Sequence, residues 1–126
     1  ERDLQSSNPW GFYNNNIIIF RYSDVVLMAA EAKFRLGQVS EALADINSLR
    51  QIRNAPLLTS LSEQDILNER AFELYWEGWR RQDLVRFGQF SRAWGHKEES
   101  EEFRKVFPIP DIAFHSNPNL VQNPGY

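Results

Sequence analysis

The sequence contains no cysteine, one methionine and only two histidines, His96 and His115. Without cysteine, a disulfide framework, a thiolate metal site and a cysteine nucleophile are all excluded. Neither histidine stands in an HExxH or ExxH pattern, and there is no glycine-rich phosphate loop. We therefore expect no metal site, no catalytic residues and no cofactor.

The sequence also lacks a long hydrophobic run and an excess of basic residues. No apolar run, residues 17–20 included, approaches the roughly 20 residues that span a bilayer. The 14 basic and 17 acidic residues give a net charge of -3, which provides no general attraction to nucleic acid. The first ten residues do not form a signal peptide, and there is no initiator Met. We expect the chain to be a processed or excised part of something longer.

What the sequence does contain is typical of a globular protein. Its 126 residues are 42% hydrophobic and 13% aromatic, which is enough for a core. We expect a single domain over residues 1–126, with an irregular lead-in at 1–20 that is extended at 17–20 because of its β-branched residues.

The middle of the chain predicts an all-α fold. A helix capped by Ser23 or Asp24 is expected over 25–36, ended by Gly37, with apolar residues on most of its sides. Ser40 is expected to cap a second helix, and the short link predicts an antiparallel hairpin. Ser62 is expected to cap a third helix that runs to about Glu77, followed by a short helix over 79–87 and Gly88. The proline- and asparagine-rich residues 106–126 predict an extended strip with one helical turn near 111–114.

The stretch ERAFELYWEGWRRQDLVRFG, residues 69–88, combines many charges with large aromatics. On a helical wheel the acids at 69, 73 and 77 fall on one narrow stripe, and enclosed charges must be paired. We expect a structural ion-pair brace made by Glu69, Arg70, Glu73, Glu77, Arg80, Asp83 and Arg86. An alternative hypothesis is a glycosidase that uses Glu73 and Glu77 as a carboxylate pair, but flanking arginines would hold both acids ionised.

Three segments in order resemble the SusD/RagB family of nutrient-binding lipoproteins. Residues 69–88 match the pattern ER-x-x-EL-x-x-EG-x-R-x-x-DL-x-R-x-G, and PIPDIAFHSNPNLVQNPGY resembles the family's closing segment. RYSDVVLMAAEAKFRLG, followed by EALADINSLR, resembles its preceding helical hairpin. The resemblance covers residues 21–126 and indicates the C-terminal part of a longer protein.

The resemblance implies a mostly α-helical fold with hairpins similar to tetratricopeptide repeats. It implies a surface lipoprotein of the bacterial outer membrane that binds glycans or other nutrients without cleaving them. It further implies a TonB-dependent transporter, SusC-like, as the partner. The lipid-bearing cysteine would lie outside this chain.

Ligand residues are harder to predict, because sugar sites need exposed aromatic rings beside polar groups. Trp10, Tyr13 and Trp94 lie outside the helical pattern and are the weak candidates for contacts with a glycan. Pinning of loops onto the core would explain the same residues. The alternative function is a stand-alone helical-repeat module for protein interaction.

Overall fold

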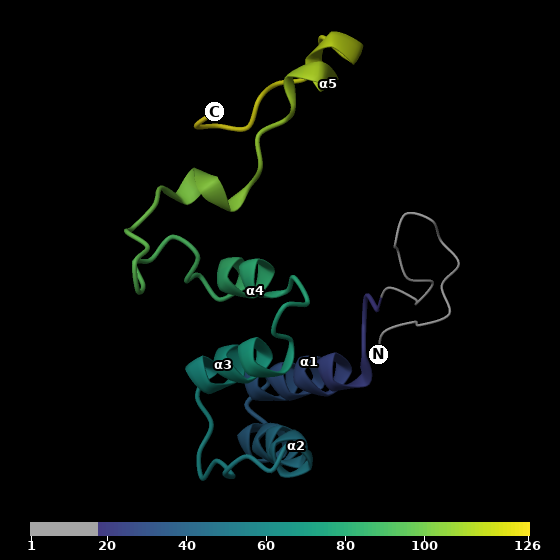
Figure 1. Cartoon of the computed structure of the whole chain (residues 1–126), viewed down its shortest axis with the longest axis vertical. Coiled ribbons are helices and arrows are strands. Elements are labelled where there is room, and N and C mark those ends of the chain that lie inside the picture. Colours follow the sequence, from purple (N-terminus) through teal and green to yellow (C-terminus); the bar gives the residue numbers. More distant parts are fainter. Residues whose placement is uncertain (1–17) are drawn as a thin grey trace, which may run out of the picture. The chain divides into compact units, whose positions relative to one another are not determined.

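The computed structural model describes residues 18–126 of the chain, and this part is mostly helical (Figure 1). The described residues contain five α-helices, one 3-10 helix and no β-strand. They divide into two compact units, one up to Glu69 and one from Arg70, so a single domain over the whole chain stays a prediction. The elements are α1 (Tyr22–Arg35), α2 (Val39–Ile52), α3 (Glu63–Glu73), α4 (Arg80–Arg86), η1 (Glu102–Lys105) and α5 (Asp111–Ser116).

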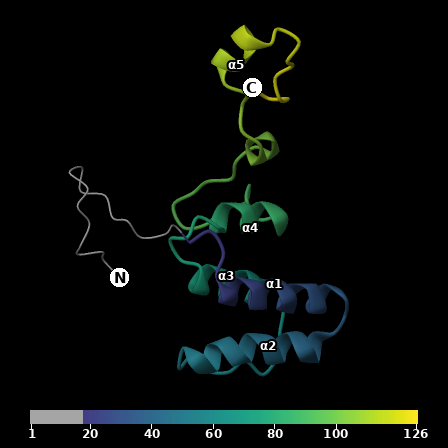
Figure 2. The same cartoon turned by 90° about the vertical axis from the view of Figure 1, so that its right-hand side faces the viewer.

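Helices α1 and α2 form the predicted antiparallel hairpin, side by side in both views (Figures 1 and 2). Gly37 ends α1 in the left-handed region, at φ +80°, and the N–H of Gln38 donates to the carbonyl of Lys33 at 2.9 Å. This is the Schellman arrangement that glycine allows without strain. The prediction of Gly37 as the helix end is therefore confirmed.

The hairpin is closed by a small apolar core and an ion pair. The fully buried side chains include Leu27 of α1 and Ile46 of α2. Lys33 of α1 donates to Asp45 of α2 at 2.7 Å. This hydrogen bond to the carboxylate raises the pKa of Lys33 above its usual range, since the partner favours the charged amine.

Two sequence predictions about the starts of these helices are wrong. Helix α1 begins at Tyr22 with Arg21 before it, so Ser23 and Asp24 lie inside the first turn, where both are buried. Helix α2 begins at Val39, so Ser40 does not precede it. Burial of Ser23 and Asp24 overrides their preference for the cap position. Residues 18–20 are exposed and belong to no helix or strand, so their extended conformation stays a prediction.

Ser62 does cap α3, as predicted. Its hydroxyl accepts from the N–H of Asp65 at 3.2 Å, and the carboxylate of Asp65 accepts from the N–H of Ser62 at 2.8 Å. This reciprocal pair satisfies two backbone donors that a helix start would leave without partners.

The end of α3 differs from the prediction. The helix stops at Glu73 and not near Glu77, and a turn follows over residues 74–78. Trp76 and Gly78 both occupy the left-handed region, at φ +65° and +81°, which no right-handed helix passes through. A wheel drawn through Glu77 and Arg80 therefore does not apply.

The C-terminal strip folds on itself through side chains that take the place of a sheet. The amide of Gln122 accepts from the N–H of Ile109 at 2.8 Å and donates to its carbonyl at 3.0 Å. Asn123 donates to the carbonyl of Phe107, and Tyr126 packs edge-to-face on Phe103. The expected helical turn is α5. Extended backbone thus obtains its hydrogen bonds without a neighbouring strand.

Candidate functional site

The centre of the charged stretch is the carboxylate of Asp83, which two arginines share. Its Oδ1 accepts from Nε of Arg70 at 2.8 Å and from Nη2 of Arg86 at 2.8 Å. The side chains of Arg70 and Asp83 are each only 3% exposed, whereas that of Arg86 is 43% exposed. Within the described part of the chain, Oδ2 of Asp83 has no hydrogen-bond partner. A buried arginine from α3 is thereby tied to a buried carboxylate in α4.

The other acids and bases of the expected brace lie in different surroundings. Glu69 forms an ion pair with Arg50 of α2. Glu73 is half-buried, and Glu77 and Arg80 are exposed. The enclosed part of the set is therefore narrower than the helical wheel predicts, and it consists of Arg70 and Asp83. That these residues act together as one structural brace stays a prediction.

The carboxylate pair of the glycosidase hypothesis loses its geometric basis. That hypothesis needs Glu73 and Glu77 on successive turns of one helix, and α3 ends at Glu73. Glu77 lies in the turn that follows and is exposed.

A surface cavity of about 610 Å³ lies beside the turn that follows α3. Its lining contains three exposed aromatics, Phe72, Tyr75 and Trp76, which are 71%, 75% and 88% exposed. The rings of Tyr75 and Trp76 pack edge to face, with centroids 6.1 Å apart. The remaining lining residues are Arg70, Ala71, Leu74, Gly78, Arg80 and Arg81. We call the three aromatics and this cavity the aromatic cleft.

Arg81 is an organising residue that the sequence analysis missed. Its Nη2 donates to the carbonyls of Arg104 and Lys105 at 3.2 and 3.1 Å. Its guanidinium also lies over the rings of Phe90 and Phe107, with centroids 4.9 and 4.2 Å away. Arg81 therefore joins α4 to η1 and the strip. Phe90 and Phe107 stand at no regular spacing from Arg81, so the sequence contains no pattern that predicts these contacts.

Of the three ligand candidates, the structure describes only Trp94, and Trp10 and Tyr13 lie outside the described residues. Trp94 is 59% exposed and stands in a short loop closed by its backbone pairing with Lys97. The Lys97 ammonium donates to the carbonyls of Ser91, Arg92 and Glu98 at 3.3, 3.1 and 2.9 Å. A single lysine thus holds this loop in one shape and leaves the Trp94 ring open.

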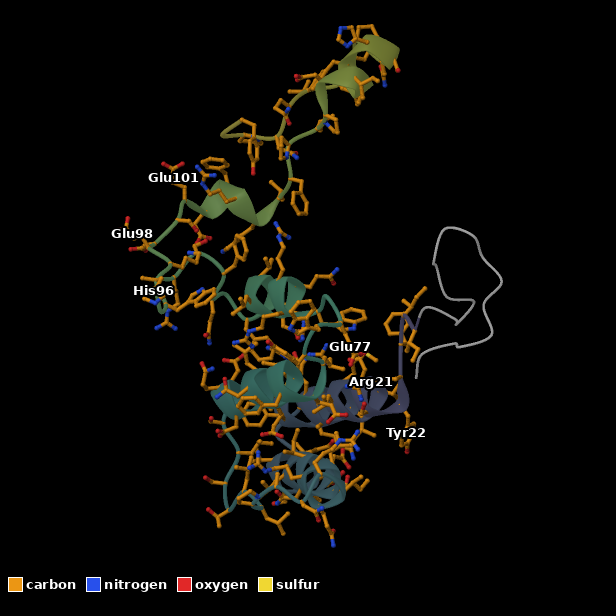
Figure 3. All side chains as sticks on the ribbon, in the orientation of Figure 1. Arg21, Tyr22, Glu77, His96, Glu98 and Glu101 are labelled. Atoms are coloured by element: carbon orange, nitrogen blue, oxygen red, sulfur yellow. The ribbon has the colours of Figure 1, made fainter. Side chains whose placement is uncertain are left out.

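Polar side chains occur in the Trp94 loop and in the residues that follow it. His96, Glu98 and Glu101 are exposed and point away from the ribbon (Figure 3). An open ring near groups that form hydrogen bonds is the chemistry that sugar recognition uses. No group of three or more potential metal ligands occurs among residues 18–126. Over the same range, no helix combines the length and the apolar character needed to cross a bilayer.

Comparison with known proteins identifies the family. The model of the SusD family matches residues 3–126, so the chain belongs to the SusD family. Proteins of this family are non-catalytic binding proteins.

Individual relatives match the chain over nearly its whole length. SusD-like protein P38 of Formosa agariphila is 36% identical over an alignment that covers 90% of this chain. The starch-binding protein SusD of Bacteroides thetaiotaomicron is 37% identical over 90%, and SusD-like protein P25 of Formosa agariphila is 32% identical over 93%. The chain spans only 25%, 22% and 25% of these relatives. It therefore corresponds to about a quarter of each relative's length.

The buried ion pair generates a prediction about stability. Replacing Asp83 with alanine leaves Arg70 buried without its carboxylate, so we expect the free energy of unfolding to fall by about 3–5 kcal/mol. The matched control is Arg86→Ala, which removes the exposed partner of the same oxygen and is expected to cost about 1 kcal/mol or less. Urea denaturation of the protein that contains this chain measures both. Equal losses for the two variants would contradict the special role of the Arg70–Asp83 pair.

Proposed function

We propose that this chain is part of a surface-exposed lipoprotein of the outer membrane that binds a glycan without cleaving it. Membership of the SusD family over residues 3–126 carries this proposal. The 37% identity to a starch-binding protein supports a glycan as the ligand class. In this proposal a SusC-like, TonB-dependent transporter is the partner that imports the captured glycan.

We further propose that the hairpin of α1 and α2 is one unit of a stack similar to tetratricopeptide repeats. Helix α1 has two apolar faces. Leu27 and Ala30 are buried, whereas Tyr22, Val25, Met28 and Leu36 are exposed and lie within about 120° of one another on the opposite side. Tyr22 points away from the helix (Figure 3). Because a single repeat cannot bury both of its faces, stacked repeats cover each other's exposed stripe.

The stack can be tested in the longer protein by oxidative footprinting. A helix packed on the exposed stripe of α1 should protect Tyr22, which is 81% exposed in this chain. We expect it to be oxidised several times more slowly in the native protein than after denaturation in urea. Equal oxidation before and after denaturation would count against a neighbouring repeat.

The Trp94 loop is the part of this chain that we propose for contact with the glycan. The exposed indole of Trp94 offers a stacking face worth about 0.5–1.5 kcal/mol. The hydrogen bonds from Lys97 to three backbone carbonyls hold the loop in place before binding. A ligand that meets a preformed ring spends less free energy on ordering it.

Glycan binding is tested on the longer protein with a panel of soluble polysaccharides that includes starch. We expect at least one to retard the protein in affinity electrophoresis, with no reducing ends released. Trp94→Ala should weaken that binding by about 2- to 10-fold, and Trp94→Phe, which keeps a stacking face, should restore most of it. If no polysaccharide binds, the glycan proposal fails. If binding is unchanged in Trp94→Ala, only the role of this loop fails.

The membrane location is tested by the intact mass of the native gene product. We expect a chain about four times as long as this one, bearing lipid on an N-terminal cysteine. A native product that begins near Glu1 without lipid would contradict the lipoprotein. It would instead favour the alternative, a stand-alone helical-repeat module for protein interaction.

A further inference from the structure

The unit from Arg70 onward exposes aromatic side chains of a kind that proteins normally bury. Phe72 at the end of α3, and Tyr75 and Trp76 in the turn after it, line the aromatic cleft and are all more than 70% exposed. Each would remove about 150–250 Å² from water if covered. An exposed, contiguous apolar patch of this size is more typical of an interaction surface than of the rest of a protein's surface.

The backbone conformation of Trp76 is energetically unfavourable. Its φ of +65° lies in the left-handed region, which bulky residues with a Cβ avoid. Such a conformation persists when other contacts stabilise it. Within this chain the side chain is 88% exposed, so burial of the indole cannot be what offsets the strain. A contact from outside the described residues would supply it.

The same unit has almost no apolar core of its own. Between Arg70 and Tyr126, Leu74 is the only apolar side chain that is buried. Hydrogen bonds from Arg81, Gln122 and Asn123 to backbone carbonyls hold the unit together instead. Since hydrophobic burial is the main favourable term in folding, a unit of this composition needs an external apolar partner.

The lining of the cleft favours a protein segment over a sugar as that partner. Among the described residues, no carboxylate and no amide side chain lines it, although these groups bond sugar hydroxyls in most glycan sites. Arg70 is engaged with Asp83, and Arg81 with the carbonyls of η1. The part of the lining that is available to a partner consists mainly of aromatic and aliphatic groups.

We infer that the aromatic cleft is the docking site for an apolar segment of the same protein that lies outside this chain. The inference rests on the proposal that this chain is part of a longer SusD-like protein. Its relatives are about four times as long as the part that this chain covers, so a large amount of polypeptide exists to supply the segment. The docked segment would cover mainly Trp76, because the Trp76 ring is the most exposed of the three.

Hydroxyl-radical footprinting of the unmodified longer protein tests the inference without any substitution. The matched internal reference is Trp94, which is less exposed in this chain than Trp76, 59% against 88%. In an uncovered cleft Trp76 would therefore be oxidised at least as fast as Trp94. We expect the reverse, with Trp76 oxidised about tenfold more slowly, and equal rates once the protein is denatured.

Each other outcome overturns the inference and says why. Similar rates for Trp76 and Trp94 in the native protein mean that the cleft is open. Protection of Trp76 that disappears on dilution means that a second copy covers it. Protection that appears only when a polysaccharide is added means that the cleft is a ligand site. A native product no longer than this chain leaves no segment to dock. A failure to bind glycans, in contrast, leaves the inference intact.

The sign of one stability change gives an independent test. Glycine adopts the left-handed region freely, so Trp76→Gly should raise the thermal midpoint if the indole is exposed. We expect the midpoint of the longer protein to fall by several degrees, because the docked ring is lost. Asn54→Gly is the control, since Asn54 is also left-handed, at φ +53°, and exposed, and its replacement should leave the midpoint unchanged or slightly raised. A rise for Trp76→Gly would overturn the inference.

Discussion

The buried ion pair between Arg70 and Asp83 is the interaction on which the C-terminal unit depends. It connects the last turns of α3 to α4, a helix of only 7 residues, and helices this short are not stable alone in water. A buried charge without its partner costs several kcal/mol, so the pair strongly disfavours any arrangement in which the two helices separate. Gly88 completes α4 in the left-handed region at φ +67°, where the chain leaves the helix without strain.

The position of this ion pair also determines where the aromatics lie. Because Arg70 and Asp83 are fixed to each other, residues 74–78 must turn back within five residues. A right-handed helix cannot make that turn, and two residues in it take left-handed conformations. The turn places Tyr75 and Trp76 at the surface of the cleft instead of along α3. The aromatic cleft is thus a consequence of the turn that the ion pair requires.

Sequence reasoning predicted those features that depend on local chemistry. Gly37, Gly88 and Ser62 were identified as helix boundaries because each satisfies backbone groups within a few residues. The cap positions of Ser23 and Ser40 were wrong, since burial and the link length set the start of each helix. The prediction of a helix through Glu77 was wrong, because no local sequence pattern indicates that Trp76 adopts a left-handed conformation.

The charged set was predicted by composition, but its pairing was not. Arg70 and Asp83 were both among the seven residues of the expected brace, but the sequence did not show which of the seven pair with each other. In the structure Glu69 pairs with Arg50 of the preceding hairpin, whereas Arg70 pairs with Asp83. Arg81 was missed altogether, because its partners are carbonyls more than twenty residues away. Long-range pairing of this kind is set by three-dimensional contact, which a single sequence does not display.

The residues that carry the family resemblance are the ones that shape the backbone. Arg70, Asp83 and Arg86 form the shared ion pair, and Gly88 ends a helix. In the closing segment, Gln122 and Asn123 take the place of a neighbouring strand. At Gly125 the φ is +98°, and a Cβ would lie 2.4 Å from the ring of Phe103.

Each of these roles concerns folding, and none presents a group to a ligand. The family pattern therefore identifies how this part of the chain is built, and it does not identify a ligand. Under the proposal of glycan binding, specificity would come from positions that the pattern leaves free. In the described residues Trp94 and its loop are such positions, because they lie between the two motifs. Substitutions in this loop would then alter the proposed ligand contact without disturbing the ion pair or the closing segment.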